Sequence, residues 1–220
     1  MDHRPPDHRP LDHRLLGRRA QQRQQRRAQI LAAAEQVFAA AGFEGASMAA
    51  IAGAAGLPKA NLHYYFGTKE ALYAALLEEL LQLWLSATEA IRPESEPAAA
   101  LEAYIRAKMA WSRRRPQASK LFANEVLRGA PLLSAHLAGG LRELVEAKSA
   151  VLRGWMAEGR MAAVEPRHLF FAIWAMTQTY ADFETQIRLV LDVPALGEAE
   201  FEAGVATVLR LVLGGLALRA

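Results

Sequence analysis

Apolar residues recur every three or four positions along most of the chain, which is the period of an amphipathic α-helix. The first such stripe starts at about Gln22, contains Ile30, Leu31 and Phe38, and meets a stop signal at Gly42. No segment alternates apolar and polar residues for long enough to form a β-strand. The pattern therefore predicts an all-α fold.

Two short helices are expected next, separated by a glycine. Ser47 is a good N-cap for a helix over 48–55. After Gly56, Pro58 suits the first turn of a second helix, over 58–66. Proline and glycine breaks divide the rest of the chain, where we expect helices over 69–92, 98–115, 117–128, 131–138, 140–160, 166–191 and 198–218.

The composition fits one small domain fused to a larger one, because 220 residues with 52% hydrophobic content can bury a real core. The absence of cysteine excludes disulfides, thiolate zinc sites and cysteine nucleophiles. No apolar run reaches the ~18 residues that span a bilayer, and the charged start is unlike a signal peptide. We therefore expect a cytoplasmic protein without a membrane partner.

Positive charge is concentrated at the N-terminus. Residues 1–27 hold eight arginines against three aspartates, whereas the rest of the chain has a net charge of −2. A local excess of this kind indicates that this end contacts a polyanion. The alternative is a solvated leader, which we favour for residues 1–16 because 2–15 repeat DHRP, DHRP and DHRL. We expect residues 1–21 to form a disordered basic tail.

The glycine-linked helix pair is typical of a DNA-reading unit, in which the second helix lies in the major groove. On that helix Lys59 suits guanine acceptors or phosphate, Asn61 suits adenine, and His63 could do either. An ordinary helical subdomain is the alternative, and for Leu62 and Phe66 burial in the core is the better interpretation.

The predicted DNA contacts extend beyond these three side chains. Tyrosine hydroxyls can reach phosphates, and Lys69 starts a helix whose N–H groups can bind the same phosphate. Arginines just before and within the first helix could reach the neighbouring minor groove. The predicted DNA-binding residues are Ser47, Lys59, Ala60, Asn61, His63, Tyr64, Tyr65, Lys69, Arg26 and Arg27.

The segment 166–191 is apolar nearly all round, which predicts a buried helix. Within it Trp174, Gln178, Asp182 and Gln186 follow one another at i, i+4 steps along one stripe. A buried glutamine needs partners for both its carbonyl and its amino group. These polar residues could satisfy one another, line a dimer seam, or face a ligand with adjacent C=O and N–H groups.

The last predicted helix carries an apolar stripe that needs a partner. Pairing with the preceding helix across a two-fold axis would cover it, giving a homodimer that reads a palindromic operator. The stripe consists of Phe201, Val205, Val208, Leu209, Val212, Leu213 and Leu216.

Residues 46–73 resemble the DNA-binding domain of the TetR family: a hydroxyl cap, I-A-x-x-A-G over 51–56, a helix ending in Tyr65-Phe66, and then Lys69. The resemblance implies a three-helix DNA-binding domain over 22–67. It also implies a helical ligand-binding and dimerisation domain over 68–220, a homodimer through the last two helices, and repression that a ligand releases. The chain departs from the family pattern at Ala49, Pro58 and His63, so the resemblance implies the mode of DNA binding and does not define the operator sequence.

The C-terminal part resembles one subgroup, the RutR-type regulators of pyrimidine utilisation, over 115–122, 129–133, 148–155 and 173–186. That resemblance implies a small-molecule effector such as uracil or thymine, which favours a dimer whose recognition helices are wrongly spaced for DNA. A different small apolar or aromatic ligand is the alternative. The expected ligand-binding residues are Phe122, Trp174, Thr177, Gln178, Tyr180 and Asp182.

An enzyme is the rival class of function, and the sequence does not favour it. One Glu165-x-x-His168 occurs, but a di-iron bundle needs two such motifs and further carboxylates. Phosphate-binding glycine loops and the common hydrolase motifs are absent. We therefore predict no catalytic residue, metal or cofactor; an adaptor protein would leave the helix pair unexplained.

Overall fold

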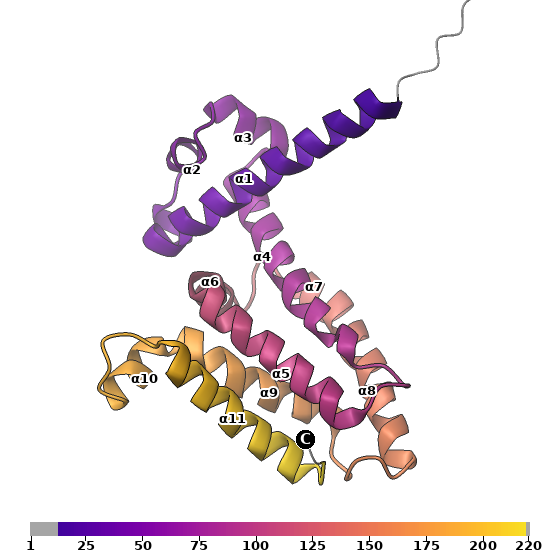
Figure 1. Cartoon of the computed structure of the whole chain (residues 1–220). Helices are drawn as coiled ribbons and strands as arrows, with labels where there is room; N and C mark the ends of the chain where they lie inside the picture. The colour runs from indigo at the N-terminus through magenta and orange to yellow at the C-terminus, as the bar shows by residue number, and fades with distance from the viewer. Residues whose placement is uncertain (1–12, 219–220) are drawn as a thin grey trace, which may run out of the picture.

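The computed structural model describes residues 13–218, and within this range the chain contains helices and no strand (Figure 1). This confirms the predicted all-α fold. Three helices form a small head: α1 (His13–Gly45), α2 (Met48–Ala54) and α3 (Lys59–Phe66). Within the segment assigned to α1, Gly42 has non-helical dihedral angles (φ 68°, ψ 174°), so the chain turns there, where the sequence predicts a stop.

A larger body lies below the head in Figure 1, and α4 (Lys69–Ser86) runs from one to the other. Thr68 caps α4 by accepting a hydrogen bond from the Ala71 N–H at 3.1 Å. The body contains the 3₁₀ turn Ala87–Ala90, α5 (Pro97–Arg114), α6 (Pro116–Leu127), α7 (Ser134–His136), the π-helical turn Leu137–Leu141, α8 (Arg142–Ala157), α9 (Pro166–Asp182), α10 (Glu184–Val190) and α11 (Glu198–Gly215).

The hydrophobic cores do not follow the division between head and body. The head core contains Phe38 and Leu62, but it also includes Ala118 and Leu121 of α6. The body has its own core around Tyr104, Trp155 and Phe170, built mainly from α5, α8, α9 and α11. Helix α6 therefore packs with the head on one side, although it belongs to the body by sequence.

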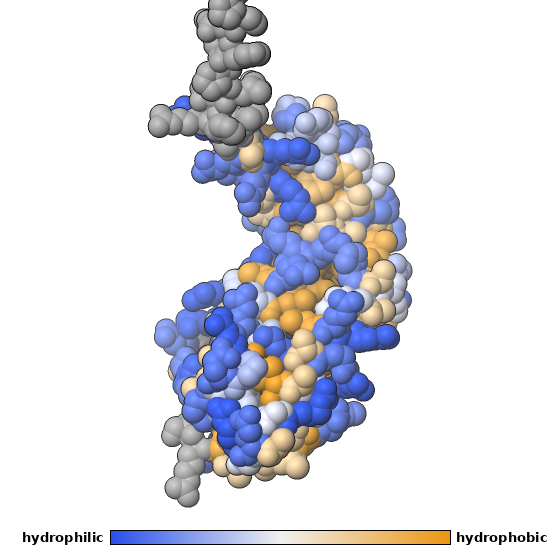
Figure 2. All heavy atoms as spheres, turned by 90° about the vertical axis from the view of Figure 1, so that its right-hand side faces the viewer, coloured by the Kyte–Doolittle hydropathy of each residue, from blue (hydrophilic) through white to orange (hydrophobic). Residues whose placement is uncertain are grey.

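Figure 2 shows the waist between head and body, and a band of apolar side chains on the body just below it. This is the side on which α4, α7 and α8 lie in Figure 1. No helix within residues 13–218 is both long and apolar enough to cross a bilayer.

The first helix begins earlier than the sequence predicts. Helix α1 starts at His13, so residues 13–21, expected to be part of a disordered tail, are helical. The prediction was wrong because it required an apolar stripe, which this arginine- and glutamine-rich segment lacks. Residues 1–12, with most of the DHRP repeat, lie outside the described range.

The single helix predicted over 166–191 is divided in two. Phe183 leaves the helical conformation (φ −114°, ψ 28°) between α9 and α10. On either side of it, Asp182 accepts a hydrogen bond from the Ser119 hydroxyl at 2.5 Å, and Glu184 pairs with Lys120 at 3.2 Å. These contacts with α6 accompany a break that the uninterrupted helical pattern of the sequence does not predict. As a result, Gln186 lies on a different helix from Trp174.

The predicted reason for dimerisation also needs correction. The α11 stripe is not an exposed strip: six of its residues are buried inside the protomer, and Leu209 is partly buried. Helices α5 and α9 cover it, because α11 packs along both of them. The outward face of α11 carries instead Ala203, Thr207, Leu211 and Gly214.

Candidate DNA interface and effector cavity

Ser47 and Gly56 shape the turn that presents α3. The Ser47 hydroxyl accepts a hydrogen bond from the Ala50 N–H at 3.1 Å, which caps α2 as expected. Gly56 has φ +63°, a conformation that favours glycine, and Leu57 N–H donates to the Ala52 carbonyl across the turn at 3.0 Å. The local sequence thus determines the orientation of α3 relative to α2.

Helix α3 turns its buried side toward the head and its polar side to solvent. Leu62 is fully buried, whereas Lys59, Ala60 and His63 are exposed and Asn61 is half-buried. Tyr64 is 74% exposed, and its ring makes an edge contact with Tyr65 at 5.3 Å between centroids. Lys59 and His63, one turn apart, therefore share an exposed face, whereas Asn61 lies on the side of the helix that is partly covered.

His63 has one ring nitrogen already engaged. Its Nδ1 lies 2.8 Å from the Gly67 carbonyl oxygen, so Nδ1 carries a proton and donates it. In the neutral ring Nε2 is then an acceptor, which can meet a base amino group or water but not a phosphate.

Lys69 is placed differently from the expectation. Its ammonium donates to the carbonyl oxygens of Phe43 (2.8 Å), Ala46 (3.2 Å) and Glu44 (3.5 Å), and it lies 4.4 Å from the centroid of the Phe43 ring. These contacts use the three ammonium protons to hold the turn at the end of α1. The geometry gives this side chain a structural role and leaves any phosphate contact at this point to the α4 N–H groups.

Arg26 and Arg27 lie where α1 meets α3 and α4. Arg27 is 3.7 Å from a Glu79 carboxylate oxygen and lies 5.6 Å from the Phe66 ring centroid, so it packs against the head. Arg26 is exposed and donates to Gln29 at 3.2 Å. Of the two, Arg26 is therefore the more available for an external anion.

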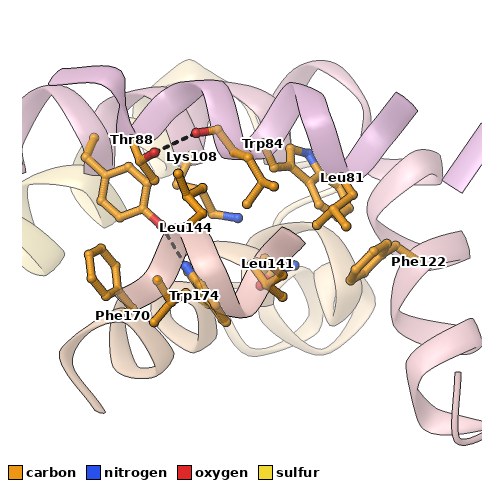
Figure 3. A pocket seen from close by; sticks show the side chains of 13 residues that line it. Leu81, Trp84, Thr88, Lys108, Phe122, Leu141, Leu144, Phe170 and Trp174 are labelled. Atoms are coloured by element: carbon orange, nitrogen blue, oxygen red, sulfur yellow. Dashed lines mark hydrogen bonds between the residues drawn. The ribbon is translucent and has the colours of Figure 1, made fainter. Parts of the chain in front are cut away.

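The body encloses a cavity of about 60 Å³ among α4, α5, α6, α8 and α9 (Figure 3). Its wall is mostly apolar and aromatic, with polar groups at a few points, as is typical of small-molecule sites. The lining residues are Leu81, Trp84, Leu85, Thr88, Tyr104, Lys108, Phe122, Leu141, Leu144, Val145, Phe170, Trp174 and Gln178.

Lys108 is the main charged group of this cavity. Its side chain reaches toward the centre, as Figure 3 shows, and the Lys108 ammonium lies 5.2 Å from the centroid of the Trp84 ring. Lys108 is only 5% exposed, and burial lowers its pKa to about 8, against an opposing effect of the Asp182 carboxylate. The cavity therefore offers a strong, poorly solvated hydrogen-bond donor.

A hydrogen-bonded pair forms the opposite wall. The indole N–H of Trp174 donates to the Tyr104 hydroxyl at 2.7 Å. Burial raises the pKa of Tyr104, so this hydroxyl keeps its proton and can donate it onward. Together with Gln178, these groups give the cavity both donors and acceptors.

Three of the six predicted ligand-binding residues line the cavity, and three lie elsewhere. Phe122, Trp174 and Gln178 are in its wall. Thr177 is fully buried and donates back to the Ile173 carbonyl at 2.7 Å, while Tyr180 packs against Phe201 of α11. Asp182 is held by Ser119, as described above, and acts on the cavity only through its charge near Lys108.

Sequence reasoning missed two wall residues that carry polar groups, Tyr104 and Lys108. The sequence does contain a signal for Lys108. This residue follows Tyr104 by four residues, on a helix face that otherwise contains Leu101, Ile105 and Met109. A lysine inside an apolar helix face is uncommon and calls for a functional explanation. Trp84 is both buried and part of the wall.

Family models match both parts of the chain. Residues 30–76 match the model described as bacterial regulatory proteins of the tetR family, and residues 77–219 match the YcdC-like protein C-terminal region. The boundary between the two matches falls within α4, the helix that joins head and body.

Curated relatives cover most of the chain. The HTH-type transcriptional regulator RutR of Escherichia coli (strain K12) is 45% identical over 187 residues, which are 85% of this chain and 88% of that protein. The RutR of Shigella flexneri has the same identity and coverage.

Solved structures agree in fold. The putative transcriptional regulator SCO4942 of Streptomyces coelicolor is 27% identical, with a TM-score of 0.66 over 88% of this chain and 99% of that one. AibR, solved in complex with isovaleryl coenzyme A and operator DNA, is 19% identical, with a TM-score of 0.64 over 84% of this chain and 97% of that one. The chain therefore belongs to the TetR family of bacterial transcriptional regulators, which are DNA-binding proteins that act as dimers and respond to small-molecule effectors, and it is not an enzyme.

Proposed function

We propose that the chain represses transcription in the cytoplasm as a homodimer, and that a pyrimidine-dione such as uracil or thymine releases it from its operator. The observation that carries the ligand assignment is the small aromatic cavity with Lys108 and Gln178 in its wall. The exposed polar face of α3 supports the DNA contact, with Lys59, Asn61 and His63 as the base-reading candidates.

The chemistry of the wall fits a flat ring with alternating carbonyl and N–H groups. Lys108 can donate to a ring carbonyl oxygen, and the Gln178 amide can accept from an N–H while donating to the adjacent carbonyl. Trp84, Phe122 and Trp174 supply aromatic faces for stacking. At about 60 Å³ the cavity favours a single ring over an extended chain.

A small aromatic acid is the second candidate effector. Its ring would stack against the same aromatic side chains, and its carboxylate would pair with the buried Lys108 ammonium. The two candidates differ in charge, so the effect of pH and of Lys108 on affinity distinguishes them.

Helix α6 provides a path from the cavity to the head. Phe122 lines the cavity, whereas Leu121, its neighbour in sequence, belongs to the head core. Trp84 also lines the cavity, and it is on α4, the helix that runs between body and head. A ligand that binds better when these two helices are displaced would shift the dimer toward head positions that no longer match successive major grooves, about 34 Å apart.

We propose that the subunits meet through α9 and α11. Their outward faces carry small or apolar residues, including Ala175 and Phe171 on α9 and Ala203 and Leu211 on α11. Contact through these faces would leave the α3 surfaces free on both subunits, as a palindromic operator requires.

A thermal-shift and calorimetric titration tests the ligand assignment. Uracil and thymine are compared with dihydrouracil, which is not planar, and with benzoate, which is a small aromatic acid. We expect the two pyrimidine-diones to stabilise the fold, by about 2.7 kcal/mol at a concentration 100 times Kd. Stabilisation by benzoate alone would favour the second candidate, and stabilisation by none of the four would contradict both.

Trp174→Ala and Val126→Ala form a matched pair of variants for the same titration. Trp174 lines the cavity, whereas Val126 is an exposed apolar residue on α6 outside it. Loss of pyrimidine binding in the first variant alone would locate the ligand in this cavity.

A further inference from the structure

The N-terminal part of α1 projects beyond the head as a helical arm, which we define as residues 13–26 (Figure 1). Among the described side chains of α1, the first to form a polar or cation–π contact with the rest of the head are those of Arg27, on Phe66 and Glu79, and Gln29, whose amide donates to the Ala55 carbonyl at 2.7 Å. At about 1.5 Å per residue the arm extends for roughly 20 Å, past α3 and away from the body.

None of the described side chains of the arm is buried in this chain. All its described side chains, those of Arg18 and residues 20–26, are exposed. Arginines recur at i, i+4 in its sequence, at 19 and 23, which destabilises a helix unless the charge is neutralised. A polar helix of this length is marginal alone in water. The arm therefore has the character of a segment that binds an anionic partner.

A groove lies between the arm and two tyrosines of α3, of which Tyr64 is exposed and Tyr65 half-buried. Its lining consists of arginine, glutamine and tyrosine side chains with no carboxylate among them, so hydrogen-bond donors dominate it. The groove is open to solvent, has a volume of about 700 Å³ and is lined by Gln22, Arg23, Gln25, Arg26, Gln29, Tyr64 and Tyr65. Because Tyr64 and Tyr65 are on α3, this surface is continuous with the base-reading face.

We propose that this groove binds one sugar-phosphate strand of the operator, next to the major groove that receives α3. The inference rests on the proposed DNA-binding function and adds a second contact to it. A helix with its side chains is about 10–12 Å wide, whereas the minor groove of B-DNA is only about 6 Å wide. The arm therefore lies along the phosphates and does not enter the minor groove, as a flexible basic tail would.

An acidic protein is the other class of partner that such an arm could meet. Duplex DNA is favoured because the groove shares Tyr64 and Tyr65 with α3, so one duplex can contact both surfaces at once. Phosphates along a duplex also repeat every few ångströms, which suits donors spaced along a helix.

The test compares two triple variants on DNA from upstream of the chain's own gene. Arg18→Gln/Arg23→Gln/Arg26→Gln removes three arm charges, and the control Arg92→Gln/Arg128→Gln/Arg142→Gln removes three exposed charges from the body. Each phosphate contact contributes about 0.9 to the slope of log Kobs against log salt, so loss of the arm in two subunits should reduce that slope by about 5. The hydroxyl-radical footprint should also shorten at both outer ends.

Two results would overturn the arm proposal: an unchanged slope and footprint in the arm variant, or an equal reduction in the control. A third protein, Lys59→Ala/Asn61→Ala, separates this failure from that of the proposed function. If the wild type shows sequence-specific binding that this variant lacks while the arm variant behaves as wild type, only the arm proposal fails. If the wild type itself shows no specific binding, the proposed function fails.

Discussion

Arg115, which precedes α6, forms an ion pair with Glu35 of α1, and both side chains are largely shielded from solvent. This pair joins the helix that carries Phe122 into the cavity to the helix on which the DNA-binding head is built. This ion pair and the apolar contact of Leu121 with the head core both join α6, or the residue just before it, to the head.

Breaking this pair should weaken the coupling between effector and operator. For Arg115→Ala we expect unchanged effector affinity in the absence of DNA, but a several-fold smaller effect of the effector on operator affinity. A stability loss of about 2 kcal/mol should accompany it, because Glu35 is left without its partner. A double-mutant cycle with Glu35→Ala measures the pair itself, and simple additivity would contradict the coupling role.

Lys108 should make stability depend on pH above neutrality. Its pKa is about 8 in the folded protein, against 10.5 for a lysine in water, so between these values the unfolded chain binds more protons than the folded one. Stability contributed by this group therefore rises as the pH goes from about 8 to 10.5. At pH 7 the buried charge costs at most about 3 kcal/mol.

Lys108→Met checks this directly, because it removes the charge while keeping most of the side-chain volume. We expect the variant to unfold at higher denaturant concentration than wild type at pH 7, and the difference to vanish near pH 10.5. Effector affinity of the wild type should fall as the pH rises through about 8, since the ammonium donor is lost. Identical pH profiles of the two proteins would show that Lys108 is not buried as a cation.

Lys59 and Lys69 should respond to substitution in opposite ways. Lys59→Ala should reduce operator affinity by about 10- to 100-fold with little change in stability, because its side chain is exposed on α3. Lys69→Met should lower stability by about 2 kcal/mol, because the carbonyls of Phe43 and Ala46 lose their donor. Chemical denaturation together with operator titration separates the two effects, and the reverse assignment would contradict the structure.

Gly204 lies against the ring of Tyr180. A Cβ at position 204 would lie 2.5 Å from the Tyr180 Cζ, so Gly204→Ala should destabilise the fold by about 1–3 kcal/mol. In a Tyr180→Ala background the same substitution should cost much less. The Tyr180→Ala variant should still bind the effector, because this ring packs on Phe201 outside the cavity wall. Loss of effector binding in this variant would show that Tyr180 contacts the ligand.

The helix-turn-helix could be predicted in detail because local sequence determines it. The Ser47 cap and the turn at Gly56 depend on residues within a few positions, and both occur where the sequence predicts them; the structure adds that Gly56 has a positive φ. The position of Lys69 is equally local, but the function of its side chain is not. The turn at Gly42 brings the Phe43 and Ala46 carbonyls to it from more than twenty residues earlier.

The effector site was only partly predictable for a related reason. Periodicity placed Trp174 and Gln178 on one stripe, but it cannot say which neighbour each face of a buried helix meets. In the structure α9 turns Trp174 to the cavity and Tyr180 to α11, and the Thr177 carbonyl accepts from Ser112 of α5 at 2.9 Å. The break at Phe183 depends on contacts with α6, which the local pattern does not contain.

The most direct test of the central claim is the affinity of the protein for DNA from upstream of its own gene, measured by fluorescence anisotropy at fixed salt with and without uracil or thymine. We expect specific binding in the nanomolar to sub-micromolar range, weakened at least tenfold by the pyrimidine in the wild type. The Trp174→Ala variant should bind the same DNA without that response. Specific binding that neither pyrimidine alters would contradict the effector assignment, and the absence of specific binding would contradict the account as a whole.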